Sequence, residues 1–124
     1  MCEIVDYEVL SKILQKDTEG RLMHAYIRLS TMCLRDIRDF LECREFSRLG
    51  QEVQFLQDSA SLLGLFDVTR LCGHINTWCT VAPQGGYPHG LVAGIRSLET
   101  ANSSAQVWML SYLCDKGLLR LSKD

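Results

Sequence analysis

Three polar residues in the middle of the chain, Gln54, Gln57 and Asp58, are spaced so that they share one face of a helix, because residues three and four positions apart are neighbours on a helical surface. The two amides donate and accept hydrogen bonds, but the lone pair of an amide nitrogen is delocalised into its carbonyl and does not attack phosphorus. Asp58 adds a negative charge beside them. The chemistry of this triplet is therefore hydrogen bonding at a surface, not nucleophilic catalysis.

The sequence around the histidines does not show a pattern of the kind that catalysis would need. His74 falls on the outward face of a predicted helix, but Thr77 and Trp78 follow it where a charge-offsetting cation would be expected. His24 and His89 show no supporting constellation. No pattern of paired carboxylates, no Cys/His dyad and no phosphate-binding loop is recognised in the sequence. It therefore predicts a protein that is not an enzyme.

The cysteines do not form a metal site or an evident disulfide framework. None belongs to a C-x-x-C pair, and no Cys/His cluster has zinc-ligand spacing, so no metal and no cofactor are expected. Several cysteines fall at core-facing helical positions, which favours buried free thiols in a reducing compartment. The six are Cys2, Cys33, Cys43, Cys72, Cys79 and Cys114.

Length and charge limit the remaining classes. A chain of 124 residues is expected to form one domain, 1–124. The net charge of −2 gives no electrostatic reason to expect nucleic acid or anionic lipid as a partner. No apolar run approaches the roughly 20 residues that span a bilayer, and the acidic N-terminus does not resemble a secretory signal. We expect a monomer in the cytoplasm, with the nucleus as the alternative location.

The spacing of apolar residues predicts helices throughout. Their expected ranges are 7–16, 19–43, 45–63, 66–80 and 91–116. An irregular connection is expected over 81–90, which holds both prolines, and Gly64 is expected to end the middle helix in a left-handed conformation. Asn102, Ser103 and Ser104 are expected to interrupt the last helix, because such side chains compete for backbone hydrogen bonds.

Each predicted helix has one apolar face, and together these faces predict the core. The central helix alternates steps of three and four residues, as in the seam of a helix bundle. Trp78 is assigned to the inner face of the helix over 66–80, and Arg70, His74 and Thr77 to its outer face. The residues predicted for the core of the two middle helices are Phe46, Leu49, Val53, Leu56, Ala60, Leu63, Val68, Leu71, Cys72, Ile75, Trp78 and Cys79.

The order and lengths of these helices predict an all-α fold, an up-and-down four-helix bundle with an additional N-terminal helix. The segment 53–64 also resembles the phosphoacceptor helix of the histidine-containing phosphotransfer (HPt) domain family, whose pattern is Ala-His-x-Leu-Lys-Gly-Ser-Ser/Ala-x-x-Leu-Gly. The residues that match are Val53, Leu56, Ser59, Ala60, Leu63 and Gly64. The helix order and lengths are most similar to the fungal single-domain phosphorelay intermediates.

The resemblance implies a degenerate member of the family. Gln54 stands at the position of the phosphoacceptor histidine, Gln57 at that of the lysine that offsets phosphoryl charge, and Asp58 at that of the glycine that leaves room for the phosphoryl group. With these three differences, a phosphoryl group would meet neither a nucleophile nor a cation. The resemblance therefore implies a protein that binds without carrying phosphate.

The same resemblance implies a docking surface for the receiver domain of a two-component phosphorelay. Phe55 and Leu62 lie off the core stripe, one heptad apart, and form a mixed apolar and polar patch with Gln51, Gln54, Asp58 and Ser59. The function expected from it is that of a pseudo-phosphotransfer protein, an inhibitor or scaffold of a relay. The alternative is an HPt-fold adaptor recruited to a protein partner outside phosphorelay signalling.

Overall fold

The computed structural model describes residues 20–81 and 89–117, with the side chain of Val81 left aside. This part of the chain forms four α-helices and no strand: α2 (Arg21–Glu42), α3 (Phe46–Leu62), α4 (Phe66–Val81) and α5 (His89–Asp115). Each predicted range between 19 and 116 agrees with an observed helix within two residues at either end. The all-α prediction is therefore confirmed. The helix expected over 7–16 lies outside the described residues.

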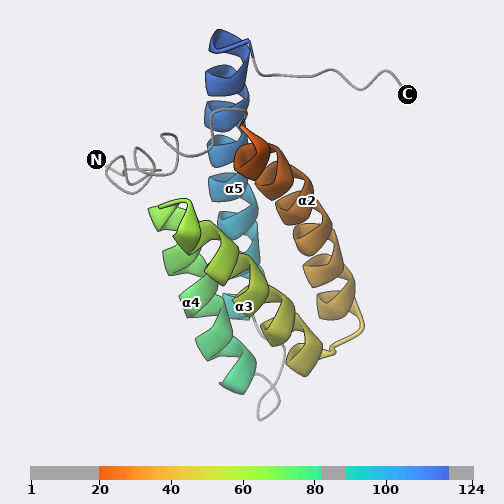
Figure 1. Ribbon diagram of the computed structural model, residues 1–124. Coiled ribbons are helices and arrows are strands. Elements are labelled where there is room, and N and C mark those ends of the chain that lie inside the picture. The colour runs from red at the N-terminus through yellow and green to blue at the C-terminus, as the bar shows by residue number, and fades with distance from the viewer. Residues whose placement is uncertain (1–19, 82–88, 118–124) are drawn as a thin grey trace.

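Helices that follow each other in sequence run antiparallel and pack side by side (Figure 1). α3 lies between α2 and α4, and α5 packs against α4. α5 packs less extensively against α2 than against α4. It is the longest of the four helices and extends past the level of the turn that joins α3 to α4 (Figure 1).

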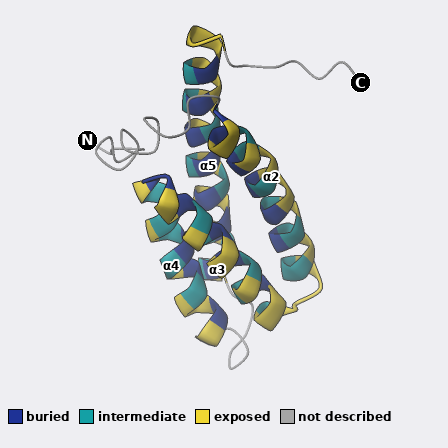
Figure 2. Cartoon of the chain, in the orientation of Figure 1, coloured by how far each residue is buried: buried dark blue, intermediate teal, exposed yellow. Residues whose placement is uncertain are grey.

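The core consists of the apolar stripes that the sequence pattern predicts, and Figure 2 shows them as the dark bands on the inner sides of the helices. α3 contributes Leu49, Val53, Leu56 and Ala60, all without exposed surface. Phe46, at the start of the same stripe, is only half-buried. Removing large apolar side chains of this kind from water supplies the main stabilising free energy of a bundle, roughly 1.5–3 kcal/mol for each.

The periodicity predicted that Trp78 lies on the inner face of α4. This prediction is wrong, because 42% of its surface is exposed. Its indole ring instead lies on the backbone of α5 at Gly90, where a methyl group in place of the glycine hydrogen would collide with the ring. The tryptophan thus closes the side of the bundle where α4 meets the first turn of α5. The Trp78 ring fits there because Gly90 has no side chain.

The interruption predicted at Asn102 is wrong, because α5 runs unbroken from His89 to Asp115. Asn102 is 1% exposed and hydrogen-bonds to α2 twice: the Tyr26 hydroxyl donates to its Oδ1 (2.7 Å), and its Nδ2 donates to Ser30 Oγ (3.0 Å). Gln106, one turn later, donates to Ser30 Oγ (2.9 Å), to Thr31 Oγ1 and to the Ile27 carbonyl. Partners across the bundle therefore satisfy the polar side chains that would otherwise compete with the helix backbone.

The turn between α3 and α4 is as tight as expected. Gly64 has a φ of 69°, in the left-handed region, and the amide of Leu65 donates to the carbonyl of Ala60 (3.0 Å). A residue with a Cβ is strained at such a φ, whereas glycine is not. Gly117, with a φ of 68°, follows the end of α5 in the same way, as the sequence predicted.

Gly64→Ala is expected to lower the free energy of unfolding by about 1 kcal/mol, because alanine must adopt the left-handed conformation. The matched control is Gly73→Ala within α4, where the new methyl group makes only an ordinary contact, 3.6 Å from Gln57 Nε2. That change is expected to be neutral or to stabilise by up to about 1 kcal/mol, since alanine favours a helix over glycine. Urea denaturation of both variants measures the difference, and equal effects would contradict the assignment.

Candidate functional site

The polar and apolar residues that the sequence assigned to a surface patch all lie on the outer side of α3. Gln51, Gln54 and Asp58 are exposed, and Ser59 is partly exposed. Phe55 is 51% exposed and Leu62 73%, which is unusual for large apolar side chains on a helix packed on both flanks. The water-facing position predicted for Gln54 is confirmed.

The Gln54 side chain is part of a hydrogen-bonded network that joins α3 to α4. Its Nε2 donates to Asp58 Oδ1 (2.9 Å), and its Oε1 accepts from Asn76 Nδ2 (3.2 Å). Asn76 Nδ2 also donates to Gln57 Oε1 (3.2 Å). The three residues that the sequence singled out for chemistry are therefore brought together, and each takes part in the same network.

Asn76 is a site residue that the sequence analysis missed. The two helices reverse direction around Gly64, and this register places Asn76 opposite Gln54. Gly50 and Gly73 lie beside this contact, but a Cβ at either position would make only an ordinary van der Waals contact, 3.6 Å from Asn76 Oδ1 and 3.6 Å from Gln57 Nε2 respectively. Counting outward from the glycine turn places residue 74, not Asn76, at the level of residue 54, so only the register of the two packed helices identifies Asn76.

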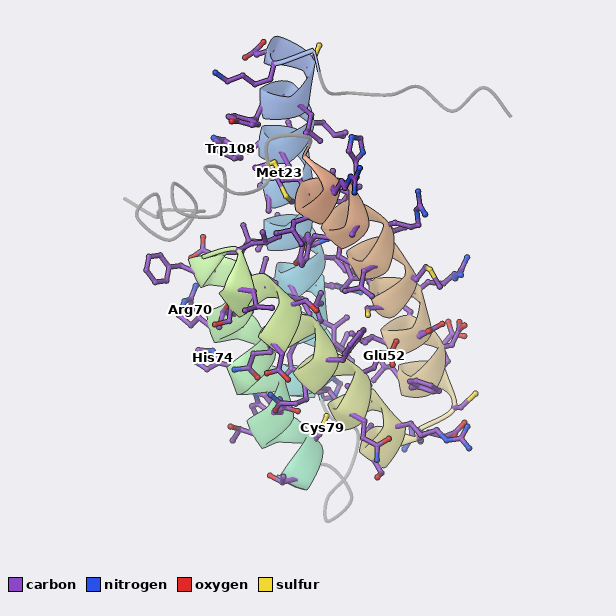
Figure 3. The ribbon with its side chains drawn as sticks, in the orientation of Figure 1. Met23, Glu52, Arg70, His74, Cys79 and Trp108 are labelled. Atoms are coloured by element: carbon purple, nitrogen blue, oxygen red, sulfur yellow. The ribbon has the colours of Figure 1, made fainter. Side chains whose placement is uncertain are left out.

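His74 does not take the place beside Gln54. It is exposed on α4, and Figure 3 shows it, with Arg70, on the side of α4 away from α3. Asn76, two residues further along, fills the position that faces residue 54. The outward orientation predicted for His74 from the periodicity of α4 is confirmed.

A shallow hollow of about 580 Å³ continues this network along the α3–α4 boundary. Its lining is uncharged, and the one thiol in it, Cys79, is 8% exposed, with a pKa raised to about 11 by burial. A thiol with such a pKa is protonated at neutral pH and is a weak nucleophile. The lining residues are Phe46, Ser47, Gly50, Gln51, Gln54, Asn76, Cys79 and Thr80. This hollow can hold a polar partner group by hydrogen bonding.

The other flank of the patch borders a second, more apolar depression. This groove, of about 350 Å³, lies between α2 and α3. Ser59 and Leu62 line it, whereas Gln51 and Gln54 line the hollow on the α4 side. The α2 contribution was not predicted, because Leu22, Ala25 and Leu29 lie beside the core stripe and only the packing of α2 on α3 brings them to Leu62. The complete groove lining is Leu22, Ala25, Tyr26, Leu29, Ser59, Leu62 and Leu63.

A carboxyl pair lies further along the same α2–α3 boundary. Glu52 lies on the side of α3 that faces α2 in Figure 3, and the Asp36 carboxyl and the Cys33 thiol of α2 are the neighbouring groups that influence its pKa. Partial burial and the nearby Asp36 raise the pKa of Glu52, and burial together with Glu52 raises the pKa of Cys33 to about 12. The carboxyl pair is therefore a local source of repulsion once both groups are ionised.

This repulsion predicts a dependence of stability on pH. Because the pKa of Glu52 is higher in the folded than in the unfolded chain, its contribution to stability is complete below pH about 4 and is lost as the pH rises through the folded pKa. Glu52→Gln is therefore expected to gain stability relative to the unmodified chain between pH 4 and pH 7, since an amide stays neutral and can donate to Asp36. Thermal unfolding across that range measures it. Glu45→Gln, at an exposed glutamate, is the control, and parallel profiles for Glu52→Gln and the unmodified chain would refute the assignment.

No cluster of three or more histidine, cysteine or acidic side chains with metal-binding geometry occurs within residues 20–81 and 89–117. Within the same ranges, no helix has both the length and the apolar character needed to cross a membrane. Comparisons with protein-family models, curated proteins and solved structures return no match to this chain.

Proposed function

We propose that this chain is a pseudo-phosphotransfer protein: an HPt-like bundle that binds receiver domains of a two-component phosphorelay without carrying phosphate, as an inhibitor or a scaffold. The observation that best supports the proposal is the exposure and hydrogen bonding of the Gln54 side chain. This amide is exposed on α3 and is held by Asp58 and Asn76, at the position where the resembling family has a nucleophilic histidine.

The surroundings of Gln54 support binding over phosphoryl transfer. Asp58 occupies the place of the family glycine and accepts a hydrogen bond from Gln54, so its carboxylate lies where the phosphoryl group would need space. Gln57, in place of the family lysine, directs its oxygen to Asn76 and supplies no positive charge. A phosphoryl group here would face a negative charge and amides instead of a cation.

The apolar part of the patch supports a protein partner. Phe55, half exposed, stands one turn from Ser59 and next to the Gln54–Asp58 pair, so an aromatic side chain is surrounded by hydrogen-bonding groups. Ser59 Oγ donates to the Phe55 carbonyl (3.1 Å), so this hydroxyl is bonded to the helix backbone beside the exposed ring. Exposed aromatics within a polar rim are typical of the energetically dominant residues of modest protein interfaces.

A titration of the full chain against a panel of receiver domains tests the proposal. Phe55→Ser is expected to weaken receiver binding at least about tenfold, equivalent to about 1.4 kcal/mol, because it removes the apolar anchor. Val107→Ser, at a 63% exposed apolar position on α5, is the matched control and should leave affinity unchanged. Absence of binding to every receiver, or equal affinity of Phe55→Ser and the unmodified chain, would contradict the proposal.

The apolar groove between α2 and α3 favours one second candidate, an HPt-fold adaptor whose partner lies outside phosphorelay signalling. The groove is separate from the polar network around Gln54 and shares only Ser59 and Leu62 with the patch. For an adaptor of this kind, Leu62→Ser abolishes partner binding while Gln54→Ala has no effect. For a receiver-binding protein, both changes weaken binding.

A further inference from the structure

The groove between α2 and α3 has the composition of a binding site for an apolar helix face. Leu22 and Leu62, on opposite walls, are 51% and 73% exposed, whereas Tyr26 and Leu63 beneath them are buried. The Tyr26 hydroxyl is directed away from the groove, since it donates to Asn102 Oδ1 on α5. The floor therefore presents the apolar part of the tyrosine and no polar atom that an occupant would have to satisfy.

The dimensions of the groove suit a short helix. On α2 it extends from Leu22 to Leu29, a rise of seven residue steps or about 10 Å along the helix. A helix lying along the groove would place one apolar side chain between Leu22 and Leu62. Its next apolar side chain, one turn further along, would lie beside Leu29. Helices that bind in this way present anchors at spacings of three, four and seven residues.

The α2 side of the groove carries positive charge and no negative charge. In the stretch of α2 from Arg21 to Thr31, the only side chains with a full charge are Arg21 and Arg28. Arg28 is exposed and forms no ion pair with any residue that the structure describes. On α3 the nearest acid, Asp58, lies one turn before Leu62 and accepts a hydrogen bond from Gln54 Nε2. Arg28, one turn after the groove residue Ala25, is therefore a cation on the α2 side that complements negative charge.

We propose that this groove binds an acidic amphipathic helix of a partner protein, with leucine-like residues in the groove and carboxylates beside Arg28. The site is distinct from receiver docking around Gln54, although the two share Ser59 and Leu62. A second copy of this chain is a poor occupant through the same face, because it would bring a second arginine rim against the first. Residues 1–19, themselves acidic and rich in apolar residues, are the competing occupant.

The test uses the full chain and a labelled designed peptide of about 15 residues, since shorter helices are marginal in water. The peptide carries leucines at i, i+4 and i+7 and glutamates on its flanks, and a counterpart replaces every glutamate with lysine. Fluorescence anisotropy is expected to show the acidic peptide binding at least about tenfold more tightly than the basic one, with a difference that shrinks at high salt. Equal binding of the two peptides would overturn the charge assignment.

Variants locate the site. Leu62→Ser is expected to weaken acidic-peptide binding about tenfold and Arg28→Glu about threefold or more. Their controls are Leu110→Ser and Arg96→Glu, both exposed on α5, which should have no effect. Circular dichroism verifies that all four variants remain folded. Unchanged binding by Leu62→Ser and Arg28→Glu would overturn the proposed location.

Two further measurements separate the competing explanations. Leu10→Asp in the full chain is expected to weaken any binding of residues 1–19 to the groove. If this variant binds the peptide much more tightly than the unmodified chain, the chain's own segment is the occupant and the proposal is overturned. Receiver binding is measured with the same proteins. If receivers bind and the peptide does not, this inference fails alone; if the peptide binds and receivers do not, only the proposed function fails.

Discussion

Incubated with a phosphorylated receiver domain or with phosphoramidate, the unmodified chain is expected to acquire no phosphoryl group, and the triple variant Gln54→His, Gln57→Lys, Asp58→Gly is expected to acquire one. The unmodified site offers an amide where a lone pair is needed, and that amide is already bonded to Asp58 and Asn76. The triple variant supplies a nucleophile, a cation and space at once.

The single variant Gln54→His separates these contributions. Its imidazole would lie one turn from the Asp58 carboxylate, with no cation from Gln57. We expect phosphoryl uptake by this variant to be on the order of a hundredfold slower than by the triple variant, the usual effect of removing one charge-stabilising group from a reacting site. Intact-protein mass spectrometry at neutral pH, where phosphohistidine survives, follows the time course.

A matched control carries Gln57→Lys and Asp58→Gly without the histidine, and it should stay unmodified. Uptake by the unmodified chain would contradict the inactive assignment. In that event His74→Gln identifies whether the exposed histidine on α4 is the acceptor. The helix itself should tolerate the triple change, since Asp58→Gly costs about 1 kcal/mol at most in a helix interior and Val53, Leu56 and Ala60 are untouched.

Asn102→Leu is expected to lower the free energy of unfolding by about 2–4 kcal/mol, although leucine is the more apolar residue and the better helix former. The change removes the acceptor of the Tyr26 hydroxyl and one of the donors to Ser30, and both partners are buried on α2. A hydroxyl left without a partner in the interior costs more than the new apolar contacts supply. Guanidinium denaturation followed by circular dichroism measures the loss.

Ser103→Leu, at the exposed neighbouring position, is the control and should change stability by less than about 0.5 kcal/mol. The double variant Tyr26→Phe, Asn102→Leu should be less destabilised than the sum of the two single changes, because it removes both ends of one hydrogen bond. Strict additivity would indicate that Tyr26 and Asn102 do not depend on each other. A cost below about 0.5 kcal/mol for Asn102→Leu would indicate that the pair contributes little to holding α5 against α2.

The sequence predicted the helices and most of the core because both depend on local periodicity. Leu49, Val53, Leu56 and Ala60 recur at steps of three and four residues, and a helix with that pattern has one apolar face whatever its neighbours are. The turn at Gly64 was predictable for the same reason, since a glycine after an apolar stripe is a local signal for the left-handed end of a helix.

The errors concern residues whose environment is set by distant parts of the chain. Asn102 was expected to break α5, but its partner Tyr26 lies 76 residues earlier in sequence. Trp78 was expected in the core, but Gly90 on another helix leaves room for its ring. In both cases local propensity was overridden by a contact that no single helix reveals.

The candidate site was predicted in part for the same physical reason. Gln54, Phe55 and Asp58 were placed outward correctly, since orientation follows from position on one helix. Asn76 and the α2 wall of the groove were missed, since they require the register of α3 against α4 and the packing of α2 on α3. The patch inferred from α3 alone is therefore the shared edge of two surfaces, one polar and one apolar.

The cysteines have a practical consequence for measuring these surfaces. Burial raises the pKa of the Cys33 and Cys72 thiols to about 12 and that of Cys79 to about 11, whereas Cys43 and Cys114 are exposed where α2 and α5 end (Figure 1). Maleimides consume thiolates, so among these five cysteines only the two exposed ones should alkylate readily in the native fold. These two cysteines lie at opposite ends of the bundle. A donor and an acceptor fluorophore attached to them would report, as a change in energy transfer, any ligand that increases the distance between α2 and α5.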